Sequence, residues 1–201
     1  MLFKESNLSF RFSKGHWKIK KYDTHRYYKI LSGAGLKGVD FLGIFEEKKI
    51  IYFEVKNFRS ANPNKVQVYS IFEDTEGFIH QIAAKLMDTR KAIDIIARYL
   101  QRKWWYRLYL KSKSFFPEFL IKTRDWFFWH QIIKISRKKE QQVLVLWLEI
   151  DQQWPSFSNE IMKQQIDEEL ENKLADYVDY VQIANSNQPV FPATLSVNRE
   201  T

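Results

Sequence analysis

The 201-residue sequence contains no cysteine, which excludes a disulfide framework and any chemistry that needs a thiolate. A chain without disulfides needs no oxidising compartment, and we expect a cytoplasmic (intracellular) protein. The first ten residues, MLFKESNLSF, lack the apolar stretch of a signal peptide. No apolar run approaches the roughly 20 residues that span a bilayer, so we expect no transmembrane segment.

Glycine is also scarce, with six residues in the chain, yet four of them lie within eleven positions. These four are Gly33, Gly35, Gly38 and Gly43. Such a concentration indicates a backbone that turns sharply or that another group approaches closely. Apolar residues make up 45% of the chain, which argues against disorder and suffices for one domain with a sizeable core.

Acidic residues are few in the first two-thirds of the chain. From Glu140 onward there are 3 basic and 11 acidic residues, a net charge of −8. The preceding residues carry 29 basic and 13 acidic residues, a net charge of +16. Folding does not require this imbalance. It indicates an anionic partner for the first two-thirds: nucleic acid, an anionic membrane surface, or the acidic end of the chain itself.

Two β-strands are predicted around the glycine cluster, at about 38–45 and 49–58, joined by the short connection EEKK. A connection of this length favours antiparallel pairing of the two strands. The second strand has a clean period of two, so alternate side chains share a face. The residues on one face are Ile50, Tyr52, Glu54, Lys56 and Phe58.

The N-terminal part predicts a hairpin over residues 7–22 that turns at the sequence SKG. Residues 23–31 fit either a short helix capped by Asp23 or Thr24 or another strand.

Further along the chain, an apolar stripe predicts a long helix at 73–101, and QVLVLWLEID at 142–151 predicts a buried strand. An acidic helix is expected at 159–182, with Ser158 as its N-cap, and loop or tail at 185–201.

Three charged residues interrupt the two apolar strands: Asp40 on the first, and Glu54 and Lys56 on the second. Two neighbouring carboxylates repel each other, so one stays protonated unless a cation lies between them. Mg²⁺ (or Mn²⁺) suits this arrangement, because Mg²⁺ takes oxygen ligands and is often held by one or two carboxylates plus substrate phosphate. The main-chain oxygen of Val55 could add a third ligand. Lys56 would then lie beside the metal, where it could orient or deprotonate a water or stabilise negative charge.

The pattern resembles the PD-(D/E)xK nuclease superfamily, in which an acid on one core strand is followed on the next by Glu/Asp-x-Lys. The matching residues are Asp40 in GVDFLGI and Glu54-Val55-Lys56 in IIYFEVKNF. The resemblance implies a restriction-endonuclease-like αβββαβ core with a mixed sheet, here in an α/β (α+β) fold with an N-terminal hairpin and a C-terminal helix. It also implies a metal-dependent phosphodiesterase that acts on DNA or RNA, with Asp40 and Glu54 as metal ligands and Lys56 as the catalytic lysine.

The sequence departs from this family at two points. Val39 stands where the family has a proline before the aspartate. Many members carry a further acid on an N-terminal helix, whereas the only early acids here are Glu5 and Asp23, and neither is placed on a helix by the pattern. The plainer interpretation of Glu54 and Lys56 is an exposed ion pair, which contributes little to stability.

Other residues near the two strands are candidate nucleic-acid contacts. They are Lys37, Arg59, Lys65, Gln81 and Lys85. Gln81 and Lys85 lie four apart on one face of the long helix, and that face can approach the active site in the family fold. The alternative is that both belong to ordinary helix surface. The four histidines show no metal-ligand spacing, and we expect them to be structural.

Residues 101–139 combine 11 lysines and arginines with 11 aromatic residues and only two acids. Basic side chains neutralise phosphates and exposed aromatic rings stack on unpaired bases, so this segment favours nucleic acid as a partner, DNA before RNA. Interfacial tryptophan beside basic residues is also typical of membrane-surface contacts. Most of the aromatic side chains are expected to be buried, with the basic residues around them.

We therefore expect a nuclease-like domain at 1–151, which includes the basic aromatic segment, and an acidic helix and tail at 152–201. The acidic helix is expected to be a solvated face, although it could pack on the basic segment of its own chain or of a second subunit in a homodimer. Two other functions stay open at this point: a catalytically degenerate nucleic-acid-binding module of the same fold, and a peripheral membrane or scaffold protein.

Overall fold

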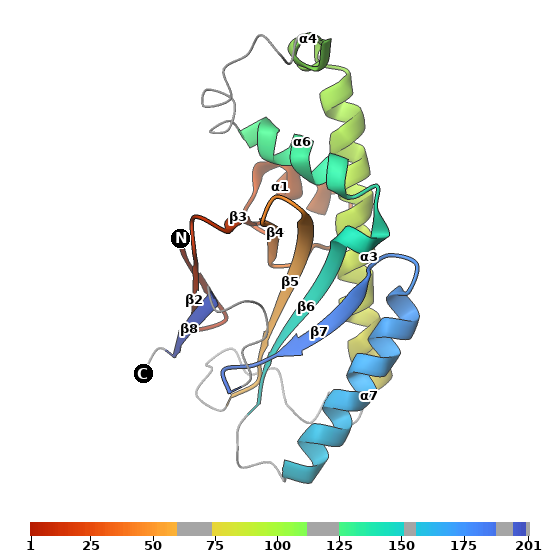
Figure 1. The fold of residues 1–201 in the computed structure, drawn as a ribbon. Coiled ribbons are helices and arrows are strands. Elements are labelled where there is room, and N and C mark those ends of the chain that lie inside the picture. Colours follow the sequence, from red (N-terminus) through yellow and green to blue (C-terminus); the bar gives the residue numbers. More distant parts are fainter. Residues whose placement is uncertain (60–73, 112–124, 151–155, 188–194, 200–201) are drawn as a thin grey trace.

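The structure, a computed structural model, describes residues 1–59, 74–111, 125–150, 156–187 and 195–199 (Figure 1). For the stretches 156–162 and 195–199 it describes the backbone alone. The chain forms a mixed α/β fold with two β-sheets and helices on one side of the larger sheet.

The larger sheet has five strands in the order β3-β4-β5-β6-β7. Their bounds are β3 Trp17–Lys21, β4 Phe41–Phe45, β5 Lys49–Asn57, β6 Gln142–Glu149 and β7 Tyr180–Ala184. The first three strands pair antiparallel, which confirms the predicted hairpin of β4 and β5. The pairs β5–β6 and β6–β7 are parallel, so long helical connections join them and the sheet is mixed.

The smaller sheet has the order β1-β2-β8, with β1 at Leu2–Glu5, β2 at Leu8–Phe12 and β8 at Leu195–Arg199. Ser6 and Asn7 form the two-residue turn between β1 and β2, with φ of 50° and 61°. The predicted tail therefore contains a strand, β8, that pairs with β2.

The predicted hairpin over residues 7–22 is wrong, because its two strands belong to different sheets. β2 pairs with β1, whereas β3 pairs with β4. The SKG turn carries the chain from one sheet to the other. The physical reason is that the phenylalanines of β2 are buried between the sheets, where they pack against aromatic rings of β4, β5 and β6. Alternating apolar and polar residues occur both in a strand that hydrogen-bonds to the next strand of its sheet and in a strand whose sheet packs against another sheet. The alternation alone therefore does not identify the partner of β2.

The five-stranded sheet separates two hydrophobic cores, one on each of its faces. One face packs against the smaller sheet through the odd-numbered residues of β5, such as Phe53 and Val55. The other face, which carries Ile50 and Tyr52, packs under the helices. The period of two that the sequence shows along β5 thus separates two cores.

The helices are α1 Arg26–Ser32, α3 Thr75–Gln101, α4 Trp104–Lys111, α6 Asp125–Ile135 and α7 Ser156–Leu174, with a 3₁₀ turn at Lys139–Gln141. The long α3 confirms the predicted helix, and Asp74 is its N-cap through a 2.8 Å bond from the Gly77 N–H. For residues 23–31 the helix is confirmed, but its cap is His25, whose Nδ1 accepts the Tyr27 N–H.

The acidic helix α7 is shorter than predicted, because it begins at Ser156 and ends at Leu174. Ser158 consequently lies within the helix instead of capping it. The chain then forms β7, which occupies the edge of β6. All eight residues of β6 are buried, so its main-chain groups need partners on both sides, and β7 supplies them on one side. This need for hydrogen-bond partners outweighs the helical spacing of Val178 and Val181, on which the longer helix is predicted.

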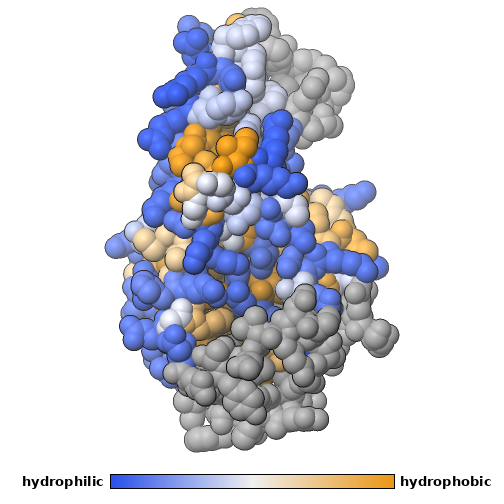
Figure 2. All heavy atoms as spheres, turned by 180° about the vertical axis from the view of Figure 1, so that it is seen from behind, coloured by the Kyte–Doolittle hydropathy of each residue, from blue (hydrophilic) through white to orange (hydrophobic). Residues whose placement is uncertain are grey.

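Figure 1 shows α7 beside the lower half of α3, near its N-terminal end, while α4 and α6 lie at the upper end. The acidic helix therefore does not cover the described part of the basic aromatic segment. The opposite view shows a surface that is mostly hydrophilic, with an apolar patch in its upper part and a further apolar area at the right edge (Figure 2). Within the described ranges, no helix has both the length and the apolar character that a bilayer crossing needs.

Candidate functional site

The β4–β5 hairpin brings the two predicted carboxylates together. Phe41 pairs with Phe53 in the antiparallel register, so Asp40, the residue before β4, lies opposite Glu54. Asp40 Oδ2 accepts a 2.7 Å hydrogen bond from the main-chain N–H of Val55, next to Glu54. Glu54 is fully buried and Asp40 is 9% exposed. The two acids therefore lie within the fold at the open end of the hairpin, on the face that packs under α3.

The helix α3 fixes the chain segment that leads into Asp40. Thr89 Oγ1 accepts the Val39 N–H over 3.1 Å and donates to the Lys85 carbonyl over 2.8 Å. Gly38 lies against two tyrosine rings, and a Cβ there would come within 2.9 Å of both Tyr22 and Tyr28. The close approach expected for the glycine cluster is thus found at Gly38, three residues before the start of β4.

Two lysines converge on Glu54 from different elements. Lys56 Nζ, two residues along β5, lies 3.1 Å from Glu54 Oε1. Lys85 Nζ, from α3, lies 2.7 Å from the same oxygen and 3.9 Å from Asp40 Oδ1. The sequence offered Lys85 as a nucleic-acid contact or as ordinary helix surface, and the structure places it against both acids. The four side chains form a charge cluster, Asp40, Glu54, Lys56 and Lys85.

Burial and mutual repulsion change how this charge cluster holds protons. Burial, and then the nearby Glu54 carboxylate, raise the pKa of Asp40 to about 7, although Lys85 and the Val55 N–H oppose the shift. Burial lowers the pKa of the Lys85 ammonium, but attraction to Glu54 and Asp40 outweighs it, so the pKa lies above its ordinary value. Near neutral pH Lys85 is therefore a cation, and Asp40 is partly protonated.

The oxygens of the cluster fit a small divalent cation. Glu54 Oε2 is buried and accepts no hydrogen bond from the residues that the structure describes. The N–H and C=O of one strand residue point to the same side, so the Val55 carbonyl faces the side where Asp40 lies. In the described part of the chain, no three His, Asp or Glu side chains are close enough together to hold a metal ion. Two carboxylates and one carbonyl, completed by water and substrate, are a set that Mg²⁺ accepts.

Two more acids lie near Asp40, and the sequence pattern could not place them. Glu5 ends β1, and its Oε2 lies 2.8 Å from Lys21 Nζ, which is also 4.0 Å from Asp23 Oδ2. The Glu5 charge contributes to the raised pKa of Asp40. Burial raises the pKa of Asp23 above its usual value, although the charges of Lys21 and Lys85 oppose the shift. Glu5 reaches this position on a strand of the smaller sheet, and no spacing in the sequence indicates that contact.

The other predicted nucleic-acid contacts are dispersed. The Arg59 guanidinium is paired with the buried Glu149 carboxylate at the end of β6. Gln81 is exposed on α3 one turn before Lys85, and Lys37 is exposed before β4. Lys65 lies outside the described residues.

The basic aromatic segment forms a packed cluster in its described part, since Tyr106, Tyr109, Phe128 and Trp129 are buried. Trp104 on α4 is exposed, at 69%. Three others, Trp105, Trp126 and Phe127, are half-buried, so half of the eight described rings are core and the expectation that most of them are buried is met only in part.

The histidines beside this segment make structural contacts, as expected. His25 Nε2 lies 3.2 Å from both carboxylate oxygens of Asp125, which Lys20 also contacts over 2.6 Å. The His25 hydrogen bond and the Lys20 charge hold the pKa of Asp125 below its usual range. His130 Nδ1 shares a 2.7 Å hydrogen bond with the Tyr106 hydroxyl.

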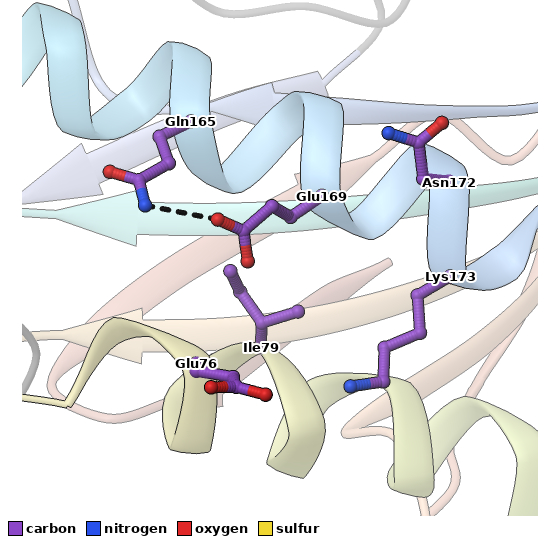
Figure 3. A pocket seen from close by; sticks show the side chains of 6 residues that line it. All are labelled: Glu76, Ile79, Gln165, Glu169, Asn172 and Lys173. Atoms are coloured by element: carbon purple, nitrogen blue, oxygen red, sulfur yellow. Dashed lines mark hydrogen bonds between the residues drawn. The ribbon is translucent and has the colours of Figure 1, made fainter.

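A groove between α3 and α7 is a separate surface feature, shown in Figure 3. Its lining residues are Glu76, Ile79, Gln165, Glu169, Asn172 and Lys173. Gln165 donates to Glu169 over 3.0 Å, so part of the polar lining is satisfied within α7. None of the residues predicted for catalysis or nucleic-acid binding lines this groove.

The raised pKa of Asp40 predicts how stability depends on pH in EDTA. The folded state binds a proton more tightly than the unfolded state, so the free energy of unfolding falls as pH rises from about 4 to about 7. We expect wild type to lose about 2–3 kcal/mol between pH 5 and pH 8 relative to Asp40→Asn, which keeps an oxygen for the Val55 N–H. Urea denaturation at the two pH values measures this difference. Parallel pH profiles of both proteins would contradict it.

Comparisons with protein-family models, with curated proteins and with solved structures found no match to this chain.

Proposed function

We propose that this protein is a metal-dependent nuclease of the PD-(D/E)xK type, which hydrolyses phosphodiester bonds in DNA or RNA. One observation carries the proposal: Asp40 and Glu54 are buried opposite each other on a hairpin, with Lys56 bound to Glu54. If Glu54 and Lys56 formed an ordinary surface ion pair, both side chains would be exposed. Burying two carboxylates costs free energy of folding, so their burial favours a functional role over a stabilising one.

The order of elements supports the same proposal. The hairpin that carries the three residues is followed by the long helix α3 and then by β6, which pairs parallel to β5. The order β3, β4, β5, α3, β6 follows the βββαβ part of the αβββαβ core, with α4 and α6 between α3 and β6. No helix precedes β3 in the described residues, although the core begins with one. Two features are this chain's own: α1 lies between β3 and β4, and the smaller sheet covers the face opposite the helices.

In the proposed reaction, Asp40, Glu54 and the Val55 carbonyl hold Mg²⁺ or Mn²⁺. The bound metal supplies positive charge to a phosphate oxygen and lowers the pKa of a bound water. Lys56, paired with Glu54, would orient the attacking water and donate a hydrogen bond to the negatively charged oxygens of the phosphate. Hydrolysis breaks one P–O bond, adds the hydroxyl of water to phosphorus, and delivers the remaining proton to the leaving oxygen. The basic first two-thirds of the chain attracts the nucleic-acid backbone.

The test is cleavage of linear duplex DNA, single-stranded DNA and RNA by wild type and Asp40→Asn, with Mg²⁺, with Mn²⁺ and with EDTA. We expect wild type to cut at least one substrate only when a divalent metal is present, and Asp40→Asn to cut none. The variant retains a side-chain oxygen that can accept the Val55 N–H, which favours an unchanged fold. Cleavage in EDTA, or equal cleavage by the variant, would contradict the proposed metal site.

A second candidate function is a nucleic-acid-binding module without catalysis. The charge cluster favours this alternative, since two lysines already pair with the two acids. This alternative predicts salt-dependent binding to nucleic acid that Asp40→Asn leaves unchanged, and no cleavage of any substrate. Filter binding at 50 and 200 mM salt, run beside the cleavage assay, separates the two candidates.

A further inference from the structure

Lys85 lies where a cation shared by the two carboxylates would lie. Its Nζ is 2.7 Å from Glu54 Oε1 and 3.9 Å from Asp40 Oδ1, whereas Lys56 contacts Glu54 alone at 3.1 Å. We propose that Lys85 is the resident counter-cation of the site, which neutralises Asp40 and Glu54 until a divalent metal displaces its ammonium. This inference rests on the proposed metal-binding function and adds a residue that controls metal affinity.

The charge balance of the cluster requires such a displacement. With Asp40 ionised, the two acids carry two negative charges that Lys56 and Lys85 balance, so the buried cluster is then neutral without metal. A divalent cation in contact with both carboxylates would meet the Lys85 ammonium within a few ångströms. Like charges at that separation repel strongly in a partly buried site. The metal therefore binds only as the ammonium moves away, and the loss of the Lys85 contacts opposes metal binding.

The way Lys85 is held makes it the lysine that can move. Its main-chain carbonyl accepts the Thr89 hydroxyl, and that hydroxyl also bonds the Val39 N–H, so the backbone of α3 is fixed at the site. Its side chain is 21% exposed and has a long flexible stem, so the ammonium can turn to solvent without moving the helix. The Lys56 side chain has a similar exposure, 20%, but its ion pair is with Glu54, so a metal between the two acids does not require the Lys56 ammonium to move.

The experiment is isothermal titration of the full-length protein with Mg²⁺ and with Mn²⁺, for wild type and three variants. We expect Lys85→Met to bind the metal at least tenfold more tightly than wild type, because it removes the competing charge. Lys85→Arg keeps the charge and can hold a carboxylate through two hydrogen bonds, so we expect weaker binding than wild type. Lys91→Met is the matched control, because Lys91 is an exposed lysine of the same helix paired with Asp88. It changes the net charge equally, and we expect less than a twofold change.

Lys85→Met and Lys85→Arg are expected to change metal affinity in opposite directions, so either variant tests the inference if the other does not fold. Lys85→Met leaves the acids with one lysine, and we expect its melting temperature to fall in EDTA and to recover with Mg²⁺ by more than that of wild type. If wild type binds metal but Lys85→Met binds it no more tightly than Lys91→Met, the inference about Lys85 is overturned and the proposed function stands. If no protein in the set binds Mg²⁺ or Mn²⁺, the proposed function itself is overturned.

Discussion

Lys56→Met is expected to lower metal-dependent cleavage by a factor of about 10²–10⁴, the range typical for loss of a positioned catalytic group. The reason is local: Lys56 is held 3.1 Å from Glu54, beside the proposed metal ligands, and methionine keeps its length but not its charge. Single-turnover cleavage at saturating Mg²⁺ measures the effect on the chemical step, separate from substrate binding.

The structure of the variant should survive, because Lys85 still neutralises Glu54 in the absence of Lys56. Circular dichroism melting checks this, and Lys91→Met again serves as the control for a lost surface charge. Cleavage by Lys56→Met within threefold of wild type would remove Lys56 from its assigned role. Such a result would not bear on the positions of Asp40 and Glu54 in the fold.

Phe53→Ala is expected to destabilise the protein by about 3–5 kcal/mol, the usual range for removing a buried aromatic ring. Phe53 is 1% exposed at the centre of the core between the two sheets. Its ring centroid lies 5.4 Å from that of Phe10, 5.9 Å from Phe41 and 6.1 Å from Trp147. These contacts join three strands of the large sheet to β2, so the loss weakens the attachment of the smaller sheet.

Urea denaturation by circular dichroism measures the change in the free energy of unfolding for Phe53→Ala. The matched control is Ile30→Ala, at a side chain that is 72% exposed, where we expect a change within about 0.5 kcal/mol. A loss below about 1.5 kcal/mol for Phe53→Ala would mean that the two sheets do not pack around this ring. Phe53 faces away from the charge cluster, so the variant also tests whether the site depends on the smaller sheet.

The sequence was sufficient for the elements whose signals are local. The alternating residues and short connection of β4 and β5 specify both strands and their pairing, and the apolar stripe with Asp74 at its start specifies α3. The charges of Asp40, Glu54 and Lys56 were recognisable for the same reason, since each interrupts an apolar strand. A period of two also places Glu54 and Lys56 on one face without any knowledge of the fold.

The elements that were predicted wrongly depend on partners far away in the chain. The acidic helix is predicted to reach residue 182, because Leu174, Val178 and Val181 follow a helical spacing. Residues 180–184 form β7 instead, because the buried β6 needs a neighbour. β2 has the alternation of a hairpin strand, but β1 and the distant β8 are its partners. Neither choice can be made from a window of ten residues, because the competing arrangements bury similar apolar surface locally.

The sequence by itself determined that a hairpin would carry two acids and a lysine among apolar residues, because strand period and composition are properties of neighbouring positions. Only the tertiary structure decided what surrounds them. Lys85 reaches both acids because α3 packs across the hairpin, and Glu5 comes near Asp40 because the smaller sheet packs on the opposite face. Both contacts arise because the helices and the smaller sheet pack on opposite faces of the five-stranded sheet. Many apolar residues in both cores stabilise this packing together, so no short stretch of sequence specifies it.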